Sequence, residues 1–192
     1  LAGWECLRVI NEVMIPALDY VGKGFEQGTI FLPQLLMSAE AAKAAFEVIK
    51  DRMQKTGQSQ EKKGKIILAT VKGDIHDIGK NIVKVLLENY SYDVIDLGRD
   101  VPPETIVSAA ADGHIPLVGL SALMTTTVPS MEETIRQLRK ETPWVKVMVG
   151  GAVLTKEYAE TIGADRYCRD AMASVNYAEE VFGGASGETS TE

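Results

Sequence analysis

Apolar residues in the first 56 positions recur at the spacing of amphipathic helices. One stripe starts at Ile10 and follows the steps i+3, i+4, i+7, i+8 and i+11, with Pro16 off the stripe. A second stripe alternates steps of four and three from Leu35 to Met53, and Pro33 before it suits a first helical turn. Two helices alone make a thin core, so we expect them to belong to a helical bundle of a longer parent chain.

The periodicity changes after residue 64, where short apolar runs with β-branched residues alternate with helical patterns. The runs lie at 65–71, 92–97, 116–122 and 145–151, with a weaker one at 165–168. The helical patterns lie at 78–90, 103–111, 128–140, 155–162 and 171–182. This alternation predicts an α/β fold, a doubly wound five-stranded parallel sheet of Rossmann or flavodoxin type with right-handed crossovers.

The segment between these two parts is polar, charged and contains glycine, a composition typical of a linker. We therefore predict a helical domain at 1–56, a linker at 57–64, an α/β domain at 65–183 and a flexible tail at 184–192.

Charge and composition narrow the classes of partner. The chain has 192 residues and a formal net charge of −7, so its surface is not built to neutralise phosphates, and we expect no nucleic-acid partner. It has no apolar run of about 18 residues and no basic segment leading into an apolar one, so we expect no membrane association and a cytoplasmic location. Cys6 and Cys168 are far apart and lack C-x-x-C spacing, which argues against a disulfide or a zinc framework.

Ligands of doubly wound sheets bind beyond the carboxyl ends of the strands, so the turns at that edge are candidate sites. The turn after the first predicted strand reads KGDIHDIG, the turn after the third reads SALMTTT, and the turn after the fourth reads GGAV. They supply a histidine with carboxylates, a row of hydroxyls, and glycines that let a ligand approach the backbone. Three such turns on one edge predict a binding site.

His76, in the first of these turns, has several interpretations. A lone histidine can simply hydrogen-bond within its turn, and a general base would need a second titrating partner that is not evident. A zinc or iron site would need ligands from His114, which we expect in a surface loop at the opposite edge, or from distant cysteines. Lys80 lacks the G-x-x-x-x-G-K-[ST] frame of a phosphate loop. A metal held in a macrocycle needs only one axial imidazole, and this interpretation stands beside the turn interpretation.

A family resemblance favours the macrocycle. The motif Asp74-x-His76-x-x-Gly79, followed by Ser121-x-Leu123 and then Gly150-Gly151, resembles the cobalamin-binding motif of B12-dependent methyltransferases and mutases. The segment at 16–43 looks like the helical cap of methionine synthase and of small corrinoid proteins in methyltransferase systems. Because the mutases lack this cap, the resemblance implies methyl transfer rather than radical isomerisation.

The resemblance implies a role for each matching residue. His76 would be the metal site, as the lower axial ligand of cobalt, and Asp74 would accept its other N–H, with Thr127 as the third relay residue. Methionine synthase has serine at that position, and Thr127 keeps the hydroxyl while adding a methyl group. These residues would form the catalytic group His76, Asp74 and Thr127.

The other implied contacts fall into three sets. The lower corrin face would be lined by Gly73, Ile75 and Asp77, and Gly79 of the same motif would also belong to the cofactor site. The nucleotide tail would be contacted or accommodated by Ser121, Thr125, Gly150, Gly151 and Ala171, and Leu123 of the second motif would also belong to the cofactor site. The upper methyl group would be shielded by the cap residues Phe25 and Leu32. Each position also has an ordinary interpretation, as a core residue, a strand-end hydroxyl or a tight turn.

The resemblance implies a methylcobalamin-carrying module of a methionine synthase-like methyltransferase, which would not turn over alone. It would shuttle a methyl group, alternating between methylcobalamin and cob(I)alamin, between methyl-donor and methyl-acceptor domains or subunits of homocysteine and/or folate type. The linker would let the cap move away from cobalt. The alternatives are a cobalamin-dependent sensor or regulatory domain, and a docking domain without cofactor.

Overall fold

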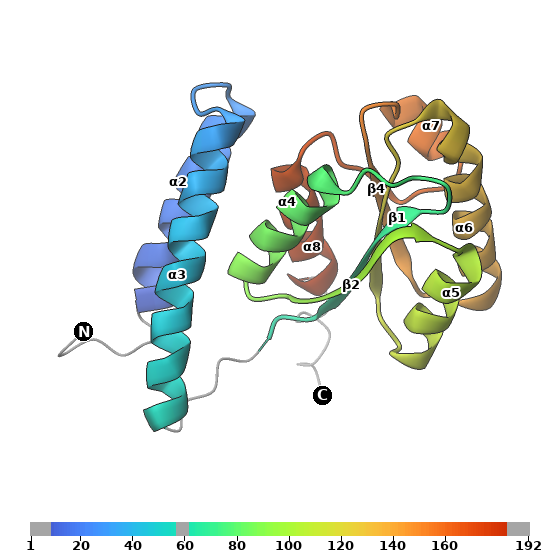
Figure 1. Ribbon diagram of the computed structural model, residues 1–192. Coiled ribbons are helices and arrows are strands. Elements are labelled where there is room, and N and C mark those ends of the chain that lie inside the picture. Colours follow the sequence, from blue (N-terminus) through green and yellow to red (C-terminus); the bar gives the residue numbers. More distant parts are fainter. Residues whose placement is uncertain (1–8, 57–61, 184–192) are drawn as a thin grey trace, which may run out of the picture. The chain divides into compact units, whose positions relative to one another are not determined.

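The computed structural model describes residues 9–56 and 62–183 of the chain (Figure 1). It divides the chain into two compact units. The first comprises Leu1–Lys62 with Asn89–Ser91, and the second comprises Lys63–Glu88 and Tyr92–Glu192. Cys6, residues 57–61 of the predicted linker and the predicted tail at 184–192 lie outside the described residues.

The first unit contains the helices that the apolar stripes predict. A π-helical turn, η1 (Ile10–Met14), leads into α2 (Ile15–Glu26), and α3 (Leu32–Thr56) follows. The π-helical turn, which the stripe did not predict, ends where Pro16 enters the first turn of α2, because proline has no N–H to continue a regular ladder. Stripe residues such as Leu18, Leu35 and Ile49 are buried within this unit.

The second unit is a five-stranded sheet in the order β2-β1-β3-β4-β5, and every neighbouring pair is parallel. Its strands are β1 (Lys65–Val71), β2 (Asp93–Val101), β3 (Leu117–Ser121), β4 (Lys146–Gly150) and β5 (Arg166–Tyr167). Its helices are α4 (Ile78–Asn89), α5 (Pro103–Asp112), α6 (Val128–Glu141), α7 (Lys156–Thr161) and α8 (Ala171–Gly183), with a 3₁₀ turn, η2 (Thr125–Thr127), before α6. The predicted doubly wound α/β fold is confirmed.

The prediction ended the second strand at Leu97, whereas β2 continues to Val101. The segment GRD interrupts the apolar run, which is why the sequence pattern ended early. This part of β2 is irregular, because the pairing of β1 with β2 shifts register on both sides of Ala69.

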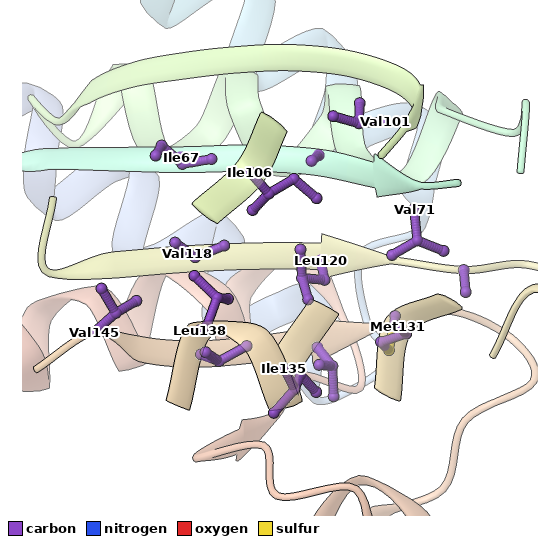
Figure 2. Packing of buried hydrophobic residues seen from close by; sticks show 14 of the residues in the cluster. Ile67, Val71, Val101, Ile106, Val118, Leu120, Met131, Ile135, Leu138 and Val145 are labelled. Carbon is purple, nitrogen blue, oxygen red and sulfur yellow. The ribbon is translucent and has the colours of Figure 1, made fainter. Parts of the chain in front are cut away.

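The core of the second unit forms because alternate strand residues point to opposite faces of the sheet. Helices α5 and α6 cover one face, and α4 and α8 cover the other (Figure 1). Figure 2 shows Ile67, Val118 and Leu120 from the strands meeting side chains of α5 and α6 such as Ile106 and Ile135. Each fully buried side chain of this size contributes about 1.5–3 kcal/mol relative to an exposed one.

The strand order reverses its direction at β1. The chain passes from β1 to β2 on one side and then crosses back to β3 on the other. Ligands of open α/β sheets bind at such a reversal, outside the carboxyl ends of the strands. The loop between β1 and α4 and the loop after β3 therefore meet at the position expected for a binding site.

Candidate functional site

The loop between β1 and α4 carries the histidine. It turns at Gly73, whose φ of +85° suits glycine, and the Asp74 N–H donates to Val71 O over 3.0 Å. The side chain of Asp74 is fully buried, with 0% exposure, while that of His76 is 46% exposed. The loop thus holds a carboxylate inside the protein and presents an imidazole at its surface.

Asp74 joins the loops after β1 and β3 through four hydrogen bonds. Its Oδ1 accepts from the His76 main-chain N–H (2.9 Å) and contacts His76 Nδ1 (2.8 Å). Its Oδ2 accepts from the Leu123 N–H (2.6 Å) and from the Thr127 hydroxyl (2.9 Å). The predicted grouping of His76, Asp74 and Thr127 is therefore present as a continuous chain of contacts.

Hydrogen bonds keep the buried carboxyl group of Asp74 ionised. Burial alone would raise its pKa, but the bonds from Leu123, His76 and Thr127 outweigh burial and hold the pKa well below its usual range. An ionised carboxylate only accepts hydrogen bonds, so His76 Nδ1 must carry the proton. Among the described residues His76 Nε2 makes no hydrogen bond, and its lone pair is available to a metal or a proton.

Thr127 contacts Asp74 through Oδ2, the carboxylate oxygen that does not contact His76. Its side chain is buried in η2, and its Oγ1 lies 2.8 Å from Met124 O as well as near Asp74. A threonine hydroxyl has one hydrogen, so the two oxygen atoms compete for it. The added methyl group, relative to serine, leaves the hydroxyl within reach of Asp74.

A second hydroxyl, which the sequence did not single out, lies beside Ser121. Thr70 and Ser121 are direct partners in the β1–β3 register, and their side-chain oxygens are 2.9 Å apart. Thr70 is fully buried and Ser121 is half-buried. A polar residue near the end of the apolar run KIILATV was the available signal, because a buried hydroxyl needs a partner.

Gly151 and Gly79, both in the predicted site, differ in whether the surrounding protein has space for a side chain. Gly151 has a φ of +142°, and a Cβ there would lie 1.8 Å from Ala122 O, so the loops after β3 and β4 can meet only with glycine. Gly79, in the first turn of α4, has no atom within 4 Å of a Cβ position. Gly151 thus has a packing role independent of any ligand, whereas the protein itself gives no packing reason for Gly79.

The remaining predicted residues are placed as follows. Ile75 and Leu123 are 60% and 42% exposed in the loops that carry His76 and Thr127. The others, from half-buried to exposed, are Asp77 before α4, Thr125 in η2, Gly150 at the end of β4 and Ala171 at the start of α8.

Phe25, in α2, and Leu32, in α3, belong to the first unit, and their predicted role above a cofactor stays a prediction. His114 is exposed in the loop before β3, at the opposite end of that strand from the site loop, and stacks on Trp144 with ring centroids 4.8 Å apart.

The described ranges 9–56 and 62–183 contain no group of three or more His, Cys, Asp or Glu residues that could hold a metal ion. Cys168 is buried and free, and burial raises the pKa of its thiol to about 11. No helix in the described part of the chain is both long and apolar enough to cross a membrane.

The chain is similar to B12 binding domains and to named corrinoid proteins. A family model described as a B12 binding domain matches residues 64–184, and a second B12 binding domain model matches residues 2–50. Dimethylamine corrinoid protein 1 of Methanosarcina acetivorans is 42% identical over 91% of this chain and 83% of the relative. Trimethylamine corrinoid protein 2 of the same organism is 42% identical over 92% of this chain and 82% of its own.

Two solved structures with cobalamin in their descriptions are also similar to this chain. A cobalamin-binding protein from Desulfitobacterium hafniense superposes with a TM-score of 0.78 at 32% identity, covering 91% of this chain and 82% of that chain. A chain of the methanol:cobalamin methyltransferase complex from Methanosarcina barkeri superposes with a TM-score of 0.81 at 30% identity, covering 95% of this chain and 70% of that chain.

Proposed function

This chain belongs to the family of B12-binding corrinoid proteins, and on that premise we propose that it carries a methyl group on a corrinoid cobalt for a methyltransferase system. The observation that carries the proposal is the imidazole of His76. Its Nδ1 is held by Asp74, and its Nε2 remains open on a half-exposed ring. An axial ligand of a macrocyclic metal needs this arrangement.

The residues around His76 fit such a group. Exposed Ile75 and Leu123 offer apolar surface beside the imidazole, and Gly79 leaves open space where a side chain would stand. A flat macrocycle that holds a metal needs one protein ligand to the metal, apolar side chains against the ring, and a space that no side chain fills. We therefore propose that His76 holds cobalt and that Gly73, Ile75, Asp77 and Gly79 lie against the lower corrin face.

The nucleotide tail needs polar contacts and space further along the same sheet edge. We propose that Ser121, held by Thr70, and Thr125 supply hydroxyl contacts to the tail. Gly150 and Ala171 would give it room. Phe25 and Leu32 are proposed to shield the upper methyl group.

When bound, the corrinoid supplies a cobalt-held methyl group that transfers as a cation equivalent. Asp74 keeps the ring of His76 in one tautomer and one orientation. When Nε2 is not bound to metal, its lone pair can accept a proton. We place this proton on His76 rather than on Asp74, because Asp74 already accepts four hydrogen bonds and its pKa is held low.

The relatives bear on the methyl donor and acceptor. They are named for dimethylamine and trimethylamine, and a similar solved structure is a methanol:cobalamin methyltransferase complex. We therefore propose partner methyltransferase subunits that act on methylated amines or methanol. The expected methionine synthase-like parent, with partners of homocysteine or folate type, has no support among these relatives, and they favour a methyl carrier over a sensor.

The test is the visible spectrum of the protein loaded with methylcobalamin, for the wild type and for His76→Ala. We expect an imidazole-ligated spectrum for the wild type and the base-off spectrum for His76→Ala. His114→Asn is the matched control, because it removes the other histidine at a position whose φ of +47° asparagine tolerates. The loaded wild type is then mixed with di- or trimethylamine methyltransferase partners and, separately, with homocysteine-type partners.

Identical spectra for the wild type and His76→Ala would show that His76 is not the ligand. Failure to retain corrinoid would contradict the function as a whole. Methyl exchange with homocysteine-type partners alone would overturn the proposed donor class.

A further inference from the structure

Asp100, near the end of β2, touches the loop that carries His76 at two points. Its main-chain N–H donates to Asp74 O over 2.9 Å, and its Oδ1 accepts from the Gly73 N–H over 2.7 Å. Both partners immediately precede the segment that presents the imidazole. Asp100, an exposed residue of the neighbouring strand β2, therefore fixes the main chain of the loop that carries Asp74 and His76.

The backbone of β2 is bent to allow this contact. Asp100 has a left-handed φ of +54°, and Gly98 two residues earlier has a φ of +90°. Non-glycine residues are uncommon in this region, because the backbone is strained unless neighbouring contacts hold it. The shifted pairing of β1 with β2 carries Asp100 alongside the loop, next to the pair Val71 and Val101. The two hydrogen bonds to the loop are the contacts that hold Asp100 in this conformation.

The other end of the loop is held by the same strand. Lys80, in the first turn of α4, has a side chain only 2% exposed and lies 2.5 Å from Asp96 Oδ1. The same Oδ1 accepts from the Gly98 N–H over 2.9 Å, and the carboxylate is also 3.3 Å from Lys84 Nζ. Asp96 therefore anchors the start of α4, just as Asp100 anchors the turn at Gly73. His76 lies between these two anchors.

We infer that Asp100 is a positioning residue for His76, acting through hydrogen bonds to Gly73 and Asp74. Without its side chain, the Gly73 N–H loses its acceptor, and only the main-chain bond from residue 100 to Asp74 O still holds the segment that aims the Asp74 carboxylate at the imidazole. Its exposed side chain adds little to the core, so its contribution is local. The consequence at cobalt rests on the proposed function, whereas the consequence for the loop does not.

The test compares Asp100→Gly with Asp100→Asn. Glycine adopts a left-handed backbone freely, so Asp100→Gly removes the acceptor without adding strain, while asparagine tolerates the backbone and keeps an Oδ1 acceptor. Asp112→Ala, at the exposed end of α5, serves as the control for loss of an aspartate. Thermal melts of all variants check that each one folds.

Two measurements are made. In the protein without corrinoid, we expect the amide of Gly73 to exchange with solvent about tenfold faster in Asp100→Gly, with exchange near the wild-type rate in Asp100→Asn and Asp112→Ala. In the protein loaded with methylcobalamin, we expect Asp100→Gly to shift the spectrum toward the base-off form at neutral pH, and Asp100→Asn to restore the imidazole-ligated form.

Unchanged exchange and an unchanged spectrum in Asp100→Gly would overturn the inference, and so would an Asp100→Asn variant that behaves like Asp100→Gly. If the wild type itself binds no corrinoid, the proposed function fails. The exchange measurement then still decides whether Asp100 holds the loop.

Discussion

Asp74 bears its charge inside the protein because four donors surround it. Oδ1 and Oδ2 each receive two contacts, from two main-chain N–H groups, one imidazole and one hydroxyl. Hydrogen bonds to a charged group contribute about 1.5–3 kcal/mol each, enough to outweigh the desolvation of a carboxylate that is partnered on all sides. The same donors belong to both loops of the site, so the ionised state of one residue holds the two loops together.

This arrangement predicts a pH-dependent contribution to stability. The pKa of Asp74 is lower in the folded protein than its ordinary value of 3.8, so ionised Asp74 favours the folded state above about pH 4. That contribution is lost as the pH falls below 3.8 toward the folded pKa. We expect Asp74→Asn to lower the free energy of unfolding by about 1–3 kcal/mol at pH 7, because an amide cannot accept from all four donors.

Urea denaturation at pH 7 and at pH 3 measures the effect, and the difference between wild type and Asp74→Asn should shrink at the lower pH. Asp112→Asn, at an exposed aspartate of α5, controls for the loss of a negative charge. A difference that stays constant between the two pH values would show that the Asp74 carboxylate is not stabilised in its ionised form.

At the scale of elements, the turns decide how closely the strands can approach. Gly151 lets the loop after β4 pass against Ala122 after β3, and its φ of +142° lies outside the range of L side chains. Gly79 stands in open space at the start of α4. Two glycines of the same predicted motif therefore differ, because a side chain at Gly151 would clash with the main chain and one at Gly79 would meet no protein atom.

These constraints predict opposite effects of one methyl group. Gly151→Ala should lower the free energy of unfolding by about 2–4 kcal/mol, because a Cβ would clash with a main-chain oxygen and the backbone would be strained. Gly79→Ala should leave stability unchanged or raise it by up to about 1 kcal/mol, because alanine favours a helix, while weakening corrinoid binding.

Chemical denaturation and corrinoid titration of both variants separate the two roles. A Gly151→Ala variant as stable as the wild type would contradict the packing role. A Gly79→Ala variant with wild-type corrinoid affinity would show that the open space is not used by the ligand.

Much of the second unit was predictable because its strands are apolar runs and its helices are periodic. The bounds of β1 and the start of α4 match the prediction, and so does the parallel architecture. The continuation of β2 to Val101 was not predictable, because glycine and charged residues hide a strand that is held by pairing rather than by burial. The partner of Ser121 was also missed, since Thr70 is linked to it only by strand register.

The site was predictable to a similar degree. The family resemblance grouped His76, Asp74 and Thr127, and their side chains lie in contact, while their roles at a cofactor stay predictions. Asp100 and Lys80 were not predicted as parts of this arrangement, because their contacts depend on the irregular end of β2 and on the packing of α4.

At the scale of the molecule, the second unit contains its own core. Every residue of the main apolar cluster, from Ile67 to Ile162, belongs to it, and so do His76, Asp74 and Thr127. A domain with its own hydrophobic core can fold independently. The fold of the second unit and the contacts of His76 are therefore expected to persist without the first helices.

We predict that a chain of residues 63–183 folds cooperatively, with a free energy of unfolding of about 5–15 kcal/mol. Loaded with methylcobalamin, it should show the same imidazole-ligated spectrum as the full chain, because the ligand and its partners are all present. If Phe25 and Leu32 shield the methyl group, the shorter chain should lose that group to solvent or light faster than the full chain. An unfolded product would show that the first unit is needed for the second to fold.

The two contacts between His76 and Asp74 have a consequence for the thermodynamics of cofactor uptake. One comes from the main chain and one from the ring, so the imidazole gives up its rotational freedom when the protein folds and not when a metal arrives. Immobilising a free side chain on association costs about 0.5–1.5 kcal/mol, mostly as entropy. If His76 binds cobalt as proposed, an incoming corrinoid meets an imidazole whose orientation is already fixed. A chain with the same histidine and no aspartate would bind with a less favourable entropy, although the bond to cobalt would be the same.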